Sequence, residues 1–342
     1  MANVSPDIAE VERRARAGDA SAQYMLSAML ARSGRREESR VWLKCAVDAG
    51  DVDALYTFAC LKLDGVDGPR DVLGAVEILK AASENGGAAA TRTLAALTAL
   101  GSVNEPSLTA AIDLLRRAAS AGDETSQIQV ALVGDGAFSR PIPDRIELSR
   151  TPDVWRIDGL LTRDECKYLV DAVKPLLHDS FVVDPGSGRA MKSTVRTSST
   201  ASVHPFQQDL VMHCINMRVS EAAGLPLEQG EMLSVLRYQP GQQYFPHFDF
   251  LDSASGLASQ WTTAGQRVAT LLVSLNDDYE GGETYFLSNG LTYKGKTGDA
   301  LLFWNVNSSG EPDITTRHAG KSVTSGVKWL LSKWFREKPF VY

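Results

Sequence analysis

The chain has 342 residues, of which 44% are hydrophobic and 23% charged. This is the balance of a folded globular protein with room for two domains, and it argues against disorder. The net charge of −7 is shared between residues 1–143, with 15 basic and 19 acidic residues, and residues 144–342, with 20 and 23. Because neither part is basic, the composition argues against binding to nucleic acid or to an anionic membrane surface.

Targeting and cysteine patterns give further limits. No run approaches the roughly 20 apolar residues of a membrane helix, and the opening Met-Ala-Asn-Val-Ser-Pro lacks the blocks of a secretory signal. The four cysteines have no CxxC spacing, which argues against a zinc site and a disulfide framework. We therefore expect a cytoplasmic protein with reduced thiols.

A repeat comes first in the chain. Four glycines, spaced 32, 36 and 36 residues apart, are each followed four residues later by alanine or serine, and an amphipathic segment of helical period precedes each one. The glycines are Gly18, Gly50, Gly86 and Gly122, and the small residues are Ala22, Ala54, Ala90 and Ser126. Each unit thus predicts a helix, a left-handed glycine turn and a second helix that packs closely.

One such helix pair cannot bury its own apolar face, so neighbouring pairs must stack. The pattern resembles Sel1-like repeats, which are related to tetratricopeptide repeats, and predicts an all-α domain over residues 1–135. The repeats can present a concave surface to a protein partner or to a substrate peptide. Alternatively, they only stabilise the second domain, cover it or form a dimer contact.

The connection and two helices follow. Pro141, Pro143 and Pro152 mark a linker over residues 136–152. Thr162-Arg-Asp-Glu165 is a capping box, which predicts a helix from about Arg163 to Leu177. A second helix is expected near Gln207–Ala223, before Gly224 and Pro226.

Residues 153–342 then take the pattern of strands. Short β-branched and aromatic runs lie between Gly, Asp and Asn, at Met232–Tyr238, Arg267–Leu275, Glu283–Phe286, Ala300–Trp304 and Val327–Phe335. Such strands, preceded by two helices, predict a jelly roll, the double-stranded β-helix. The fold class expected for the chain is α+β, with helical repeats followed by a jelly roll with flanking helices.

A possible metal site lies among these strands. His247-Phe-Asp249 is followed 71 residues later by His318. On a strand, residues i and i+2 share a face, so His247 and Asp249 can reach one metal ion together. A histidine on a neighbouring strand completes a set of two histidines and one carboxylate, which leaves positions open on Fe(II) for a chelating cosubstrate and dioxygen. The other histidines, which we expect to be surface or structural residues, are His178, His204 and His213.

Lys328 comes ten residues after His318, on the last predicted core strand. Taken alone it indicates a lysine on the solvent face, because burying an ammonium is costly without an anion. The spacing to His318 favours burial, with the distal carboxylate of 2-oxoglutarate as the anion. Tyr238 and Thr284 carry hydroxyls that can donate to the same cosubstrate.

From Val154 to Glu337 the sequence resembles the catalytic domain of prolyl 4-hydroxylases, which are Fe(II)- and 2-oxoglutarate-dependent dioxygenases. The matching stretches are, in order, Asp179–Asp184, Val195–Ser198, Leu236–Asp249, Glu280–Thr284, Gly298–Trp304, His318–Gly320 and Gly326–Trp329. The resemblance implies a hydroxylase that decarboxylates 2-oxoglutarate to succinate with dioxygen, and ascorbate is expected as a further cofactor.

The resemblance also assigns roles to residues. It implies that the catalytic set is His247, Asp249 and His318, holding iron, with Lys328, Tyr238 and Thr284, holding 2-oxoglutarate. Arg267 falls at a substrate-side arginine of the family, and a salt bridge to a nearby acidic residue is the alternative for it.

Two departures from the family concern the substrate rather than the iron. Lys321 and Ser322 replace a cysteine and a proline after His318-Ala-Gly, and Thr200–Val203 replaces a glycine and an aromatic residue. The stretch Leu251–Gln266, with Trp261 as a substrate-binding candidate, is either a lid over the site or an ordinary surface loop.

Three functions remain open at this stage. The first is a hydroxylase of prolyl or other residues in a peptide or protein, with the repeats helping to bind it. The second is a hydroxylase of a free or carrier-bound amino or imino acid, such as proline or pipecolate. The third is a scaffold without catalysis, which an intact triad and Lys328 disfavour.

Overall fold

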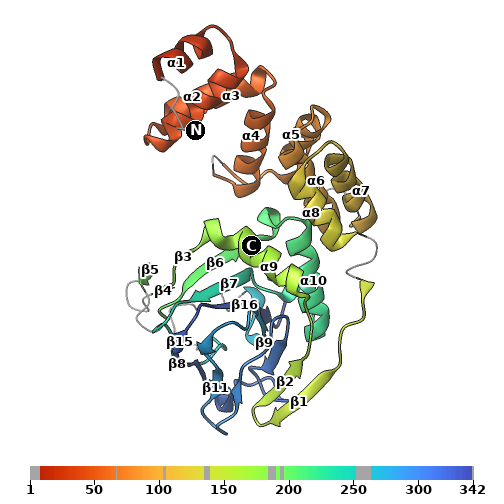
Figure 1. Cartoon of the computed structure of the whole chain (residues 1–342), viewed down its shortest axis with the longest axis vertical. Coiled ribbons are helices and arrows are strands. Elements are labelled where there is room, and N and C mark those ends of the chain that lie inside the picture. Colours follow the sequence, from red (N-terminus) through yellow and green to blue (C-terminus); the bar gives the residue numbers. More distant parts are fainter. Residues whose placement is uncertain are drawn as a thin grey trace. The chain divides into compact units, whose positions relative to one another are not determined.

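The computed structural model (Figure 1) describes residues 8–66, 68–102, 105–134, 139–183, 190–192, 196–251 and 263–340. The chain divides into two compact units. Unit 1 comprises Met1–Asp135 with Phe206–Leu210, and unit 2 comprises Gly136–Pro205 with Val211–Tyr342.

Unit 1 contains the helical repeats. Each helix contacts the next along the chain, which is the stacking that the repeat pattern predicts. The helices are α1 Ile8–Arg16, α2 Ala20–Arg32, α3 Arg36–Asp48, α4 Val52–Asp64, α5 Val72–Glu84, α6 Ala88–Leu100, α7 Leu108–Ser120 and α8 Glu124–Val133.

The repeated glycines take the left-handed conformation that was predicted. Their φ angles lie between 77° and 96°, and a β-carbon added at any of them would meet no atom within 4 Å. The backbone conformation, and not lack of space, therefore requires glycine there. The small residues four positions later are all fully buried, where a larger side chain would push the helices apart.

Unit 2 is built of antiparallel sheets, so the jelly-roll prediction is confirmed. The large sheet has the order β1-β2-β13-β9-β16-β7-β6-β3, and the smaller one β12-β11-β14-β8. The large-sheet strands are β1 Arg145–Arg150, β2 Asp153–Ile157, β3 His178–Asp179, β6 Ser199–Val203, β7 Leu233–Tyr238, β9 Arg267–Ser274, β13 Ala300–Trp304 and β16 Lys328–Arg336. The small-sheet strands are β8 Tyr244–His247, β11 Thr284–Phe286, β12 Thr292–Tyr293 and β14 His318–Gly320, and two ribbons pair β10 Glu280–Gly281 with β15 Val323–Ser325, and β4 Phe181–Val183 with β5 Ala190–Lys192.

Both faces of the large sheet are covered at its centre. Leu236, Leu272 and Leu330 belong to a cluster that includes Phe286 of the small sheet. Their neighbours along the strands, such as Val235 and Val273, are fully buried as well. Helices α9 (Arg163–Val173) and α10 (Leu210–Ala223) pack beside this sheet within unit 2 (Figure 1). Burial on both faces explains why these strands are continuous apolar runs.

Two details differ from the expectations. The linker expected at residues 136–152 contains a strand, because β1 pairs with β2 at the edge of the large sheet. An edge strand tolerates exposed polar side chains, so Arg145–Arg150 does not have the apolar pattern of a core strand. The helix expected to reach Leu177 ends at Val173 and continues as a 3₁₀ turn, since Pro175 cannot donate a backbone hydrogen bond.

The buried stripe of α5 allows a matched stability test. Leu79 is fully buried among the repeats, whereas Leu73 on the same helix is 64% exposed. We expect Leu79→Ala to lower the free energy of unfolding by about 2–5 kcal/mol, since it leaves a cavity. Leu73→Ala is expected to change it by less than about 0.5 kcal/mol. Urea denaturation followed by circular dichroism measures both, and equal effects would contradict the packing described.

Candidate iron and 2-oxoglutarate site

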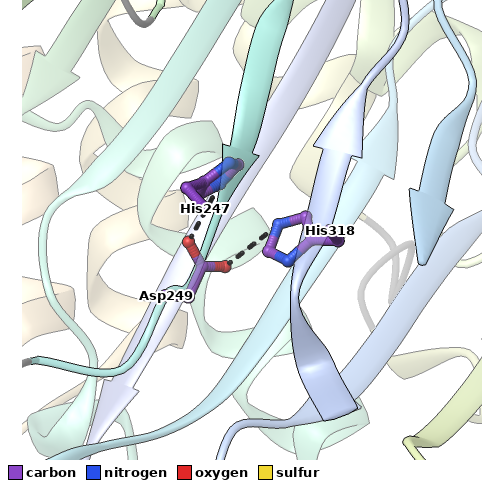
Figure 2. A group of neighbouring side chains, drawn as sticks. All are labelled: His247, Asp249 and His318. Atoms are coloured by element: carbon purple, nitrogen blue, oxygen red, sulfur yellow. Dashed lines mark ion pairs between the residues drawn. The ribbon is translucent and has the colours of Figure 1, made fainter. Parts of the chain in front are cut away.

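Strands β8 and β14 bring the two histidines of the predicted triad together. His247 and His318 are direct partners in the antiparallel register, and their ring centroids lie 4.3 Å apart. The Asp249 carboxylate lies between the rings, with Oδ1 at 3.6 Å from His247 Nε2 and Oδ2 at 3.7 Å from His318 Nε2 (Figure 2). One ligand atom from each residue lies within 4.8 Å of the others, which suits three ligands of one metal ion.

Both imidazoles are held with the same nitrogen toward this point. His247 Nδ1 lies 2.8 Å from the Phe245 carbonyl, and His318 Nδ1 lies 3.0 Å from the Thr316 carbonyl. A carbonyl oxygen only accepts, so each Nδ1 carries the proton. With Nδ1 in this role, the nitrogen left to offer a lone pair toward Asp249 is Nε2, as in a metal ligand.

The charges of the triad suit a divalent cation. Burial alone would raise the pKa of the Asp249 carboxyl, but the facing His318 and His247 rings and Arg267 hold it well below its usual range. Burial lowers the pKa of His318 to about 4, helped by His247 and opposed by Asp249. At neutral pH the site therefore has an ionised carboxylate beside a neutral His318, a donor set that fits Fe(II) and leaves coordination positions for other ligands.

One premise about this site was wrong. Asp249 does not share a strand with His247, because β8 ends at His247 and Asp249 lies in the bend that follows. The strand alternation that was expected to align the two side chains therefore does not apply. The carboxylate is instead held by contacts that the chain makes after β8.

Lys328 lines the same pocket as the triad and is buried. Tyr238 and Thr284 also line this pocket. Lys328 pairs in register with Tyr238, donates from Nζ to the Gly282 carbonyl at 2.6 Å and lies over the Tyr238 ring. These contacts are uncharged, and burial lowers the pKa of Lys328 to about 8. A buried ammonium facing a pocket is suited to receive the carboxylate of 2-oxoglutarate.

The Gly-Gly pair before Thr284 shapes this end of the pocket. Both glycines have positive φ, at 72° and 70°. A β-carbon on Gly281 would lie 2.3 Å from the Ser322 carbonyl, and one on Gly282 would lie 3.2 Å from Cδ of Lys328. Any other residue here would displace the lysine or the neighbouring backbone, which gives a physical reason for this part of the motif.

Arg267 forms a salt bridge, the alternative that the sequence left open. Its guanidinium makes two bonds to Glu231, at 2.6 and 2.7 Å, and packs on the Trp334 ring. Glu231 also accepts from Arg336. Arg267 is not among the residues that line the pocket. A role toward substrate for Arg267 therefore has no support in the part of the chain that the structure describes.

The pocket includes residues that the sequence reasoning did not select. Arg196 lines the pocket, and its backbone forms an isolated antiparallel β-bridge with Tyr244. Its guanidinium lies over the Tyr244 ring, and that ring stacks on His247. Arg196 belongs to one of the stretches that carry the family resemblance, and this was the available signal. Trp261 and residues 252–262 of the candidate lid lie outside the described residues.

Comparisons with known proteins agree with this geometry. The family model described as the 2OG-Fe(II) oxygenase superfamily matches residues 233–336, which include the triad and Lys328. Prolyl 4-hydroxylase 1 of Arabidopsis thaliana is 38% identical over 205 residues, which is 56% of this chain and 71% of that relative.

Solved structures match the two parts of the chain separately. A viral collagen prolyl hydroxylase from Paramecium Bursaria Chlorella virus-1, in a 2OG complex, is 29% identical with a TM-score of 0.41, over 54% of this chain and 95% of that one. A Sel1 repeat protein from Oxalobacter formigenes is 21% identical with a TM-score of 0.34, over 37% of this chain and 98% of that one.

A change of Lys328 tests the cosubstrate end of the pocket. Lys328→Met removes the charge, so we expect 2-oxoglutarate to bind about 10- to 150-fold more weakly, the loss of about 1.5–3 kcal/mol for a hydrogen bond to a charged group. Lys333→Met removes another buried lysine of β16 that does not line the pocket, and affinity should stay unchanged. Isothermal titration with 2-oxoglutarate measures both.

The same lysine predicts a pH dependence. With a pKa of about 8, Lys328 is charged at pH 7 and becomes neutral as the pH rises through 8. The dissociation constant of 2-oxoglutarate should thus be flat below pH 8 and rise by up to about tenfold per pH unit above it. Lys328→Arg stays charged and should flatten the rise. A rise that persists in the arginine variant would assign the dependence to another group.

Proposed function

The chain belongs to the prolyl 4-hydroxylase family of Fe(II)- and 2-oxoglutarate-dependent dioxygenases, and we propose that it hydroxylates a prolyl residue within a peptide or protein. The observation that carries the proposal is that the His247, Asp249 and His318 triad and the buried Lys328 line one pocket. A metal at the triad and a dicarboxylate on the lysine would then meet inside it.

The residues divide the work in this proposal. His247, Asp249 and His318 hold Fe(II), and Lys328 receives the distal carboxylate of 2-oxoglutarate, with Tyr238 and Thr284 beside it. With dioxygen, the bound iron and 2-oxoglutarate supply the oxidation that converts a C–H bond to C–OH as succinate and carbon dioxide form. The protein's part is to orient the cosubstrate, present one C–H bond and keep bulk water from a largely buried site.

Two observations support a peptide rather than a free imino acid. Prolyl 4-hydroxylases 1 and 5 of Arabidopsis thaliana are each 38% identical to this chain over the matched residues. Phe245 and Phe248, on either side of His247, are 45% and 37% exposed. Exposed aromatic rings are typical of surfaces that bind proline-rich segments, whereas a single imino acid inside the pocket would not need them.

We expect Asp249→Ala and His247→Ala to abolish succinate formation, since each removes a ligand of the metal. The measurement is 2-oxoglutarate turnover by purified protein with Fe(II) and a proline-rich peptide. Lys167→Ala on the exposed face of α9 serves as a control and should keep full activity. Full activity in either triad variant would sink the proposed site.

The substrate class is tested with the same preparation. We expect hydroxylation of the proline-rich peptide, detected by mass spectrometry as a gain of one oxygen atom, and none of free L-proline or pipecolate. Hydroxylation of the free imino acid alone would replace the proposal with a role in small-molecule metabolism.

We propose that the repeats bind the protein that carries the prolyl residue. A groove between α3 and α4 supports this, with Leu43, Val47, Phe58 and Val66 among its lining residues. Val66 remains 59% exposed at this groove. Exposed apolar side chains that gather at a groove are typical of surfaces that bind a partner.

Val66→Glu tests this role of the groove. It should lower kcat/KM several-fold for a long poly-L-proline chain and leave a short proline-rich peptide unaffected, because only the long chain can reach a second binding surface. Val41→Glu is the control, since Val41 is equally exposed but does not line the groove. Equal losses for both substrates would contradict a docking role. Loss of a dimer on sedimentation in the Val66 variant would assign the groove to self-association instead.

Two expectations stay predictions. Ascorbate dependence follows from the family chemistry, and a cytoplasmic location follows from the composition. Among the described residues, no helix has both the length and the apolar character needed to cross a bilayer.

A further inference from the structure

Asp249 lies beyond the end of β8, yet its carboxylate is held from the large sheet. Thr270 Oγ1, on β9, donates to Asp249 Oδ2 at 2.8 Å. Asn305, directly after β13, donates from Nδ2 to Thr270 Oγ1 at 2.9 Å. Thr270 and Asn305 are both fully buried. The three side chains thus form one chain of hydrogen bonds that ends on a triad residue.

The donor and acceptor of each of these hydrogen bonds follow from the chemistry of the side chains. An amide nitrogen can only donate, so Asn305 takes a lone pair of the Thr270 hydroxyl, and the hydroxyl proton is left for the carboxylate. The opposite end of the amide, Asn305 Oδ1, is buried without a hydrogen-bond partner. A buried acceptor left unsatisfied is costly, which indicates that the residue is kept for its donor.

Backbone hydrogen bonds between neighbouring strands fix the positions of Thr270 and Asn305. Strands β9 and β13 are neighbours, and Thr270 pairs in register with Phe303. The backbone N–H of Asn305 donates to the Val268 carbonyl at 2.8 Å, and its own carbonyl accepts from Asp313 at 2.9 Å. The hydroxyl therefore occupies a set position in the large sheet, whereas the two histidines come from the small sheet.

The backbone around Asp249 is held by other groups. Gln266 accepts from the N–H of Leu251 at 2.6 Å and donates to the Leu251 carbonyl at 3.0 Å, and Arg267 donates to the Asp249 carbonyl at 3.5 Å. These bonds place the residue but leave its carboxylate free to turn. The Thr270 hydroxyl acts on the carboxylate itself. It donates to Oδ2, which also lies 3.7 Å from His318 Nε2, while Oδ1 faces His247.

We propose that Thr270 and Asn305 are positioning residues that hold the Asp249 carboxylate as a one-oxygen metal ligand. Turning the carboxylate to bind through both oxygens would strain or break the bond from Thr270 to Oδ2, so this bond favours binding through one oxygen and leaves the remaining coordination positions for the cosubstrates. The inference rests on the proposed iron site, and it concerns neither the substrate nor the repeats.

The test measures metal binding rather than turnover. Co(II), a stand-in for Fe(II) that is stable in air and visible by absorption, is titrated into the metal-free full chain by calorimetry. Loss of a group that orients a metal ligand typically costs about 10- to 100-fold in affinity. We expect that loss for Thr270→Val, which keeps the shape and removes the hydroxyl. Thr270→Ser keeps the hydroxyl and should stay within about threefold of wild type, with the wild-type Co(II) absorption spectrum.

Asn305 is tested through its dependence on Thr270. Asn305→Leu should weaken Co(II) binding less than Thr270→Val does, and the double variant should bind no more weakly than Thr270→Val alone, because the amide acts only through the hydroxyl. Additive losses would overturn this part of the proposal.

The control is Thr91→Val in the repeats, where another buried threonine loses a hydrogen bond to the Gly87 carbonyl. It should bind Co(II) as wild type does. A folded Thr270→Val that binds Co(II) with wild-type affinity overturns the proposal, as does a serine variant as weak as the valine variant. If Thr270→Val does not fold, wild-type affinity in Asn305→Leu overturns it. Failure of the wild-type chain itself to bind Co(II) would instead contradict the proposed iron site.

Discussion

The pairing of β8 with β14 is the constraint on which the site depends. It sets His247 opposite His318, so that both rings face Asp249. A slip of one residue would turn one of the rings to the opposite face of the sheet. Core packing holds the register, because His318 lies against Phe286 on the next strand and against Phe303 of the large sheet. The metal site is thus a consequence of how the two sheets pack.

Burial gives the pocket its electrostatic character. Burial lowers the pKa of His318 and of Lys328. Burial by itself would raise the pKa of Asp249, but the neighbouring His318, His247 and Arg267 hold it low enough for the carboxylate to stay ionised. The direct contacts of Lys328, a carbonyl and an aromatic face, do not neutralise it. Holding a charged lysine there costs stability, and an anionic cosubstrate offsets the cost when it binds. Burial thus has two effects: it lowers the pKa of Lys328, and it favours binding of a dicarboxylate that can pair with the lysine.

The sequence predicted most where short-range rules decide the structure. The glycine turns, the buried small residues of the repeats and the capping box of α9 each depend on a few neighbouring residues. It predicted less where distant segments meet. Glu231 lies 36 residues before Arg267, so the sequence could not choose between a salt bridge and a substrate contact. The edge strand β1 was missed because its partner, and not its own pattern, makes it a strand.

The sequence by itself determined the two parts of the chain, the jelly roll, and the residue types that can hold iron and 2-oxoglutarate. These follow from periodicity, spacing and family motifs, which are local properties of the chain. Only the tertiary structure decided that Arg267 is paired with Glu231, that Asp249 lies outside its strand, and that Thr270 holds its carboxylate. The two contacts join segments that are distant in the chain, and the end of β8 depends on how that strand pairs; all three are set by packing over the whole domain rather than by any one segment.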